Sequence, residues 1–222
     1  MATPAPRQRP PAEELRRSAG TTDSDAAGVL PRQAATVILL RGGAETLEVL
    51  LVQRTHAARF MPGVWVFPGG AVDAHEGEGD SAHRLAAVRE LQEEAAVRGI
   101  APAELVEFSR WITPREVSVR FDTHFFLARA PDGARVAVDG DECIDVGWFT
   151  AGAALAAHER GNLPLVFPTL KQLEQLAAFG SADALIAHAL RHEVVPVPPP
   201  VVLAGEVARV LLPGEPGYDE EA

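Results

Sequence analysis

The stretch VWVFPGGAVDAHEGEGDSAHRLAAVRELQEEAAV, residues 64–97, contains the pattern that decides the fold. Its first four residues form a short apolar run, which predicts a strand, and Pro68-Gly69-Gly70 predicts a turn at its end. A segment with several acidic residues follows. A helix is then predicted over residues 81–97, with Asp80 or Ser81 as its N-terminal cap. This order raises the question of whether the acidic residues bind a metal or form the solvated face of an ordinary helix.

The acidic side chains of the predicted helix fall within one arc of the helical wheel. Glu90, Glu93 and Glu94 lie roughly opposite an apolar face, which is typical of an ordinary solvated helix surface. This face gathers Leu85, Val88, Leu91 and Ala95. Carboxylates at i,i+3 and i,i+4 repel one another, whereas a divalent cation reverses the sign of that interaction. Their hard oxygen atoms suit Mg²⁺ or Mn²⁺, and a carbonyl of the glycine turn can add a ligand.

The spacing of these residues resembles a known family motif. Gly70-x5-Glu76, followed by Arg89-Glu90-Leu91-x-Glu93-Glu94, is similar to the Nudix box, G-x5-E-x7-R-E-U-x-E-E-x-G-U. Twelve residues separate Glu76 from Arg89 where the family has seven, and Ala96 stands where the family has glycine. The longer loop leaves Glu78 and Asp80 as alternatives for the first acidic position. Neither departure removes a carboxylate from the helix.

The resemblance implies an α/β (α+β) fold, a Nudix-type mixed β-sheet sandwiched between helices. It also implies a pyrophosphohydrolase that uses Mg²⁺ or Mn²⁺ to cleave a nucleoside diphosphate linked to another moiety. Glu90, Glu93 and Glu94, with the carbonyl of Gly70, are then the expected metal ligands. The expected catalytic residues are Glu93, Glu94 and Arg89, and Glu142 is a candidate general base whose alternative is an ordinary surface residue at a turn.

The substrate is expected to meet a second set of residues. Arg54 and Arg120 can hold phosphates with bidentate geometry, although each can also be a plain surface arginine. Gly69 and Phe67 are the other candidates, Phe67 with a core role as its alternative. The stretches VLLVQRTHAARFMPGVWVFPGGAVDA and WITPREVSVRFDTHFFLA resemble the coenzyme A and acyl-CoA diphosphatase branch, which makes CoA or acyl-CoA a candidate substrate.

The rest of the chain divides by composition. Residues 1–32 are rich in Pro, Ala and Arg, which predicts a disordered tail, and residues 33–222 are expected to form the Nudix domain. Strands are predicted at 34–41, 46–54, 119–130 and 142–150, with a turn at 131–133. Helices are predicted at 151–161, 168–180 and 181–192, with Gly180 ending the second and Ser181 capping the third. This helical extension, about 151–222, is a candidate pocket wall or homodimer contact.

Charge and composition exclude several function classes. The formal net charge of −11 opposes nonspecific nucleic-acid binding. The sequence has no apolar run long enough to cross a bilayer, and its first residues lack the apolar region of a secretory signal, so we expect a cytoplasmic protein. Its single cysteine, Cys143, is expected to be a buried, inert thiol. We expect His124 to be structural, and His188 and His192 to lack a third zinc ligand. The alternative to an active enzyme is a Nudix-fold nucleotide-binding or regulatory module with weak catalysis.

Overall fold

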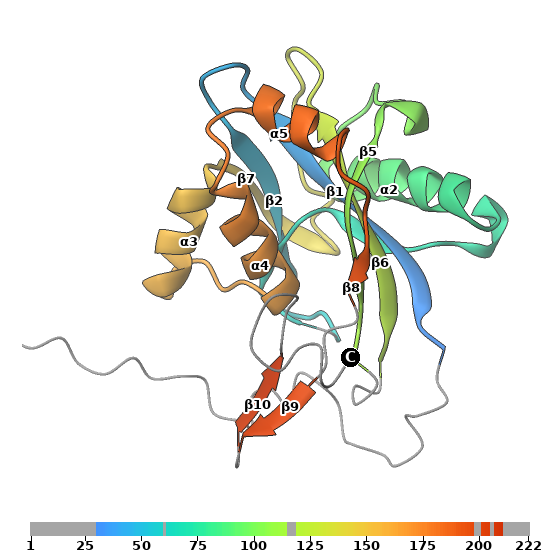
Figure 1. Ribbon diagram of the computed structural model, residues 1–222, viewed down its shortest axis with the longest axis vertical. Coiled ribbons are helices and arrows are strands. Elements are labelled where there is room, and N and C mark those ends of the chain that lie inside the picture. Colours follow the sequence, from blue (N-terminus) through green and yellow to red (C-terminus); the bar gives the residue numbers. More distant parts are fainter. Residues whose placement is uncertain (1–29, 60, 115–118, 198–200, 205–206, 211–222) are drawn as a thin grey trace, which may run out of the picture. The chain divides into compact units, whose positions relative to one another are not determined.

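The computed structural model describes residues 30–59, 61–114, 119–197, 201–204 and 207–210 (Figure 1). Most of the predicted N-terminal tail and the acidic end at 211–222 lie outside these residues. The chain separates into two compact units, and the larger one comprises residues 32–111 and 121–196. In the smaller unit, β9 (Val201–Ala204) and β10 (Val207–Val210) form an antiparallel pair. The domain boundaries expected from the sequence stay predictions.

A mixed sheet forms the centre of the fold. Its order is β3-β2-β1-β6-β5-β8, with β4 paired to β1 and β7 paired to β2. The strands are β1 (Arg32–Arg41), β2 (Glu48–Arg54), β3 (Trp65–Val66), β4 (Gly69–Ala71), β5 (Val106–Ile112), β6 (Phe121–Arg129), β7 (Cys143–Phe149) and β8 (Pro196–Val197). β1 pairs with β6 in parallel and with β2 and β4 antiparallel, which confirms the predicted mixed sheet.

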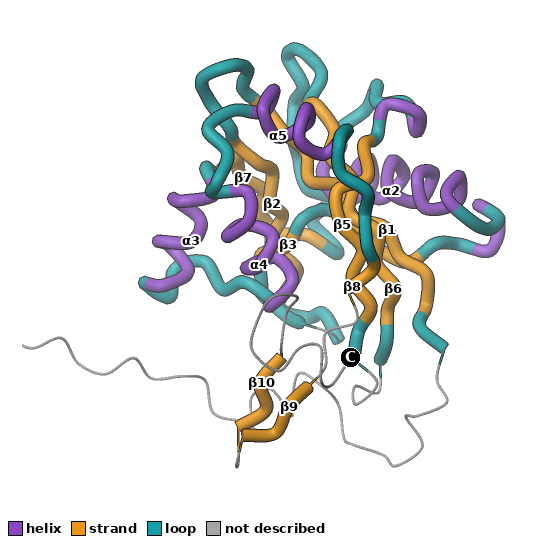
Figure 2. Tube along the Cα trace, viewed as in Figure 1, coloured by secondary structure: helices purple, strands orange, loops and turns teal. Residues whose placement is uncertain are grey.

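Helices cover both faces of this sheet (Figure 2). They are α2 (Asp80–Ala95), α3 (Ala151–Glu159), α4 (Phe167–Leu176) and α5 (Ala182–Ala189), with short 3-10 turns η2 (Ala74–Glu76) and η3 (Pro102–Glu104). Alternate residues of β1 enter two separate cores. Val37 and Leu39 pack against α2, whereas Ile38 and Leu40 pack with α3, α4 and α5. The predicted sandwich is confirmed.

Several local predictions were wrong. The sequence pattern did not predict β5, whose residues are mostly half-buried and lack a continuous apolar run. The predicted glycine turn is instead strand β4, since Gly69 and Gly70 pair with β1. Helix α4 ends at Leu176, before Gly180, although Ser181 does cap α5 by accepting a hydrogen bond from the amide of Ala184 at 3.2 Å.

The buried face of α2 matches the predicted one only in part, because Leu91 and Ala95 are buried as predicted but Leu85 is not. Leu85 is 45% exposed, whereas Ala86 and Ala87 are fully buried against the sheet. The N-terminal cap is Gly79 rather than Asp80 or Ser81. Small residues occupy the contact because they let the helix approach the sheet closely. None of the described helices has the length and apolar character that a membrane span requires.

Candidate active site

The glycine strand β4 lies between β1 and helix α2. Gly69 and Gly70 pair with Thr36 and Ala35 of β1. A Cβ atom on Gly69 would lie 2.5 Å from the carbonyl oxygen of Ala35, and one on Gly70 would lie 2.6 Å from Cδ of Glu90. Gly69 needs glycine because a Cβ there would meet the backbone of β1, whereas a Cβ on Gly70 would meet the movable end of the Glu90 side chain. The glycines therefore bring the main chain directly against the helix glutamates.

Glu94 is the most deeply buried of these glutamates. Only 2% of its surface is exposed, and its Oε2 accepts a hydrogen bond from the amide of Gly69 at 2.9 Å. Burial raises the pKa of Glu94 to about 7, helped by the negative charges of Glu90 and Glu142 and opposed by the Gly69 bond and the charge of Arg54. The helix surface that carries Glu94 is therefore not a solvated face.

Arg89 connects the helix to the preceding loop. Its Nε donates to Oε1 of Glu76 at 2.9 Å, and its guanidinium also reaches Glu90 at 2.8 Å and Glu93 at 2.9 Å. A further bond runs from Arg89 to the carbonyl of Ala71 at 3.0 Å. Burial lowers the pKa of Arg89, but the bonds to its three glutamates outweigh burial and raise it. Arg89 is thus held in one orientation by partners on both sides.

The loop between β4 and α2, residues 72–79, is called the box loop below. Its Glu76 takes the contact with Arg89, while Asp80 pairs instead with Arg84 at 2.6 Å and Glu78 lines a separate cavity. Burial raises the pKa of Glu76, but the bonds from Arg89 and the amide of Asp73 outweigh it and hold the pKa below its usual range. These contacts favour Glu76 over Glu78 and Asp80 for the first acidic position.

The two remaining helix glutamates differ in exposure. The Glu93 side chain is 57% exposed, whereas Glu90 is largely buried beside Gly70. Burial raises the pKa of Glu90 even though Arg89 lowers it. Among the described residues, no three His, Cys, Asp or Glu side chains already form a metal cage. Arg89 binds Glu90 and Glu93, so both side chains would have to rotate before a cation could bind them together with Glu94. The carboxylate oxygens suit a hard divalent cation.

Arg54 and Glu142 approach the same site from β2 and β7. The pairing of these strands shifts register between Gln53 and Arg54. Its Nε is buried and has no hydrogen-bond partner among the described residues. Glu142 directly precedes β7, and its carbonyl accepts a hydrogen bond from the amide of Thr55 at 2.8 Å. The charges of both side chains act on Glu94.

The other residues singled out from the sequence have contacts of their own. The ring of Phe67 is buried in the core that α3, α4 and α5 cover, so it is not available for stacking on a substrate. Arg120 belongs to the smaller unit, where its Nε donates to the carbonyl of Thr113 at 3.2 Å, and its phosphate role stays a prediction. Cys143 is a buried free thiol, as expected, and burial raises its pKa. His124 lies beside Glu107 at 2.7 Å.

Sequence patterns missed one buried polar residue near this site, His83. It lies on α2, and its ring packs 3.9 Å from that of His124. Its position on the helical wheel could have revealed it, because His83 shares the buried face of α2 with Ala86 and Ala87. A histidine on an inward-facing small-residue surface needs hydrogen-bond partners, and the structure provides them.

Similar proteins support the Nudix family that the box residues resemble. A family model described as NUDIX domain matches residues 30–167, more than half of the chain. A Caenorhabditis elegans protein whose name assigns it to the nudix hydrolases, as number 7, is 27% identical over 180 residues, 66% of this chain and 60% of that protein. The peroxisomal coenzyme A diphosphatase ndx-8 of the same organism is 32% identical over 126 residues, 53% of each protein. The chain thus spans less than two thirds of these relatives.

Solved structures agree with this assignment. A NUDIX hydrolase from Alicyclobacillus acidocaldarius has a TM-score of 0.63 and 27% identity, over 72% of this chain and 97% of that one. The NUDIX domain of Shewanella oneidensis NrtR, in complex with ADP ribose, has a TM-score of 0.51 and 22% identity, over 68% and 89% of the two chains, and supports the fold alone. Family match, fold and box residues coincide, and the chain belongs to the Nudix family.

Proposed function

We propose that the protein is a pyrophosphohydrolase that uses Mg²⁺ or Mn²⁺ to cleave a nucleoside diphosphate linked to a second moiety. The observation that carries this proposal is the buried carboxylate of Glu94, held against the amide of Gly69 beside two further negative charges. A desolvated carboxylate among like charges is costly unless a cation joins it. Glu94 therefore has the environment of a metal ligand rather than of a surface residue.

Each residue of the site has a role in this proposal. Glu90, Glu93 and Glu94 would hold the cation, together with a backbone carbonyl of Gly69 or Gly70. A bound divalent ion would neutralise pyrophosphate charge and lower the pKa of the attacking water. Arg89 orients Glu90 and Glu93 by direct hydrogen bonds, and Glu76 holds Arg89.

Arg54 and Glu142 complete the proposed site. The unpartnered Nε of Arg54 is a donor that a phosphate oxygen of the substrate can satisfy. Glu142 is the candidate general base, because its charge acts on both Glu90 and Glu94 and it therefore lies near the cation position. Positioning and charge stabilisation dominate this class of reaction, so the site needs no covalent nucleophile.

CoA or acyl-CoA is the substrate class we propose to test first. Its support is the 32% identity with ndx-8, which is named as a coenzyme A diphosphatase. The test is a substrate panel of CoA, acyl-CoA, NADH, ADP-ribose, nucleoside triphosphates and dinucleoside polyphosphates, each with Mg²⁺ or Mn²⁺ at mildly alkaline pH. Hydrolysis in ¹⁸O-labelled water followed by mass spectrometry of the products identifies the attacked phosphorus.

Variants connect turnover to the site. Glu93→Gln and Glu94→Gln should each lower kcat/KM by roughly a hundredfold or more, since each removes a charge from the reacting centre. Glu159→Gln, at the end of α3, is the matched control and should retain full activity. No turnover of any panel member, together with tight binding of one of them, would identify a binding module instead. Full activity in both glutamate variants would make the helix a scaffold only.

A further inference from the structure

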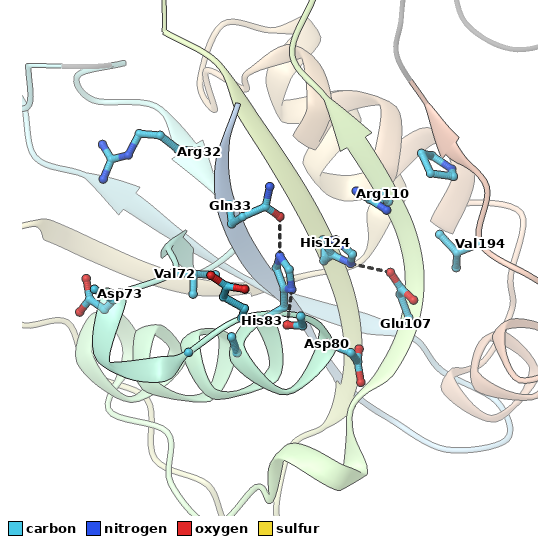
Figure 3. A pocket seen from close by; sticks show the side chains of 16 residues that line it. Arg32, Gln33, Val72, Asp73, Asp80, His83, Glu107, Arg110, His124 and Val194 are labelled. Atoms are coloured by element: carbon cyan, nitrogen blue, oxygen red, sulfur yellow. Dashed lines mark hydrogen bonds and ion pairs between the residues drawn. The ribbon is translucent and has the colours of Figure 1, made fainter. Parts of the chain in front are cut away.

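A second polar cluster lies at the N-terminal end of α2, separate from the glutamates of the candidate site. It surrounds a cavity of about 820 Å³ lined by residues of β1, β5, β6 and the box loop (Figure 3). His83 lines this cavity, although only 5% of its surface is exposed. His83 lies on α2, and its ring nitrogens face Gly79 at the start of that helix and Gln33 on strand β1.

Both ring nitrogens of His83 face oxygen atoms. Nδ1 lies 2.8 Å from the carbonyl oxygen of Gly79, and Nε2 lies 2.9 Å from Oε1 of Gln33. The amide of Gln33 is oriented by Asp122, its partner on the neighbouring strand, whose carboxylate accepts a hydrogen bond from the Gln33 side chain. Figure 3 shows the Gln33 oxygen directed at His83 and its nitrogen directed away.

Arg110 fixes the other end of this chain of hydrogen bonds. It binds Asp122 through two bonds, from Nε at 2.8 Å and from a terminal nitrogen at 2.6 Å. Burial raises the pKa of Asp122, but the bonds from Arg110 outweigh it and keep the pKa below its usual range. Asp122 is therefore an ionised acceptor, so Gln33 must donate to it and must present its oxygen to His83.

The protonation state of His83 follows from its two partners. A neutral imidazole carries one N–H and can satisfy only one carbonyl oxygen, whereas an imidazolium carries two and satisfies both. The carbonyl of Gly79 cannot donate, and the Gln33 oxygen is held in place. Both hydrogen bonds of the His83 ring therefore form only when both of its nitrogens are protonated.

Neighbouring charges allow this state. The charged or titratable groups around the pair of rings are Asp80 and Arg84 on α2, Arg32 on β1, Asp122 on β6, Glu107 and Arg110 on β5, and Asp73 and Glu78 in the box loop. Burial, and then the charge of His83, lower the pKa of His124, although Glu107 opposes them. Burial and the neighbouring ring therefore disfavour a second proton on His124.

Gly79 connects this cluster to the candidate active site. It is the N-terminal cap of α2 and ends the box loop, and its carbonyl also accepts from the amides of Ala82 at 3.1 Å and His83 at 3.3 Å. The same loop carries Glu76, which holds Arg89. We propose that His83 is a positioning residue whose imidazolium, by donating to Gln33 and Gly79, holds the box loop and so the Glu76–Arg89 pair in place. Deprotonation releases one of the two bonds and loosens the loop.

Two measurements test this inference, which rests on the proposed catalytic role of Arg89 and the helix glutamates. The first needs neither substrate nor metal, so it is independent of that role. Imidazole ¹H–¹⁵N correlation spectra of the wild-type protein, assigned with His83→Gln, should show both His83 nitrogens protonated at about pH 5.5 and one losing its proton as pH rises. A His83 that stays neutral with a single tautomer throughout this range overturns the proposal.

The second measurement is the pH profile of kcat. The ratio of wild-type to His83→Gln activity should be about tenfold at low pH, where His83 donates to both Gln33 and Gly79. It should fall toward unity as His83 loses its proton. His75→Gln is the matched control, because His75 lies exposed on the same box loop, and its ratio should stay near unity at every pH. A His83→Gln ratio that does not change with pH would show a merely structural role. Protein that is inactive on every substrate but shows the His83 titration would instead contradict the proposed function alone.

Discussion

Arg89 donates from Nε to Oε1 of Glu76 at 2.9 Å across a separation of thirteen residues. This bond joins helix α2 to the box loop, and the same guanidinium reaches Glu90 and Glu93 on the helix. One side chain therefore sets the position of three carboxylates. The longer loop of this chain does not prevent the contact, because extra loop length costs little closure entropy.

Replacing Arg89 with lysine should lower kcat by roughly ten- to a hundredfold while leaving the fold intact. A lysine ammonium keeps the charge but cannot reproduce the fork of bonds to three glutamates and the carbonyl of Ala71. Steady-state kinetics and a urea unfolding curve measure the two effects separately. Arg84→Lys, on the same helix, is the control and should change stability by a similar amount with little change in kcat. Equal losses of activity in the two variants would contradict the role given to Arg89.

Replacing Glu94 with glutamine should stabilise the metal-free protein at alkaline pH. The folded-state pKa of Glu94 is raised from 4.5 to about 7, so its contribution to stability is present below pH 4.5 and is lost as pH rises through 7. A neutral glutamine avoids this loss, and its carbonyl still accepts from Gly69. The expected gain in unfolding free energy at about pH 8 is on the order of 1–3 kcal/mol.

Urea denaturation with a chelator present, at about pH 5 and about pH 8, measures the Glu94→Gln effect. The two proteins should differ much less at the lower pH. Glu174→Gln, on the exposed side of α4, should show no such pH dependence. A variant less stable than the wild type at both pH values would show that ionisation of the buried Glu94 carboxylate does not destabilise the fold.

Replacing Ala96 with glycine should stabilise the protein by about 0.5–1 kcal/mol. Ala96 caps the end of α2 with φ 57° and ψ 16°, in the left-handed region that favours glycine. Ala95→Gly, one residue earlier and inside the helix, should instead destabilise by about 1 kcal/mol. Thermal unfolding of both variants gives the comparison, and a destabilising Ala96→Gly would mean that the backbone there is not strained.

Sequence patterns predicted most of the strands and helices, including the acidic helix, because these depend on hydrophobic periodicity over long segments. The mixed sheet between helices was implied by the family resemblance. The family motif placed Glu76, Arg89 and the helix glutamates in one site, and the structure brings these residues together. Arg54, a candidate from the sequence, also lies close enough for its charge to act on Glu94, although no sequence pattern signals the register shift beside it.

The errors have physical causes. A helical wheel placed Leu85 inside and the glutamates outside, but α2 packs on the sheet through three alanines and Leu91, and Leu85 stays exposed. Glu94 is consequently buried even though it looked solvated. The pairing of the glycine strand and the hydrogen bonds of His83 depend on contacts between distant segments, which local spacing does not encode.

Replacing Gly70 with alanine should lower activity far more than stability. The new Cβ would overlap the Glu90 carboxylate, which is the flexible end of a side chain and can move aside. The fold should therefore lose only about 1 kcal/mol, whereas a displaced Glu90 should lower kcat and Mn²⁺ affinity by roughly tenfold or more. Enzyme kinetics, a Mn²⁺ titration and thermal unfolding measure the three quantities.

Two further variants separate the steric effect of Gly70→Ala from a general loss of glycine. Gly43→Ala is the matched control, since a Cβ there meets nothing within 4 Å, and it should change stability by no more than about 0.5 kcal/mol and leave kcat unchanged. Adding Glu90→Ala to Gly70→Ala removes the overlap, so the stability costs of the two single changes should not add. Activity should remain low in that double variant, because the carboxylate itself is missing. Additive stability costs, with full activity in Gly70→Ala, would show that Gly70 does not place Glu90.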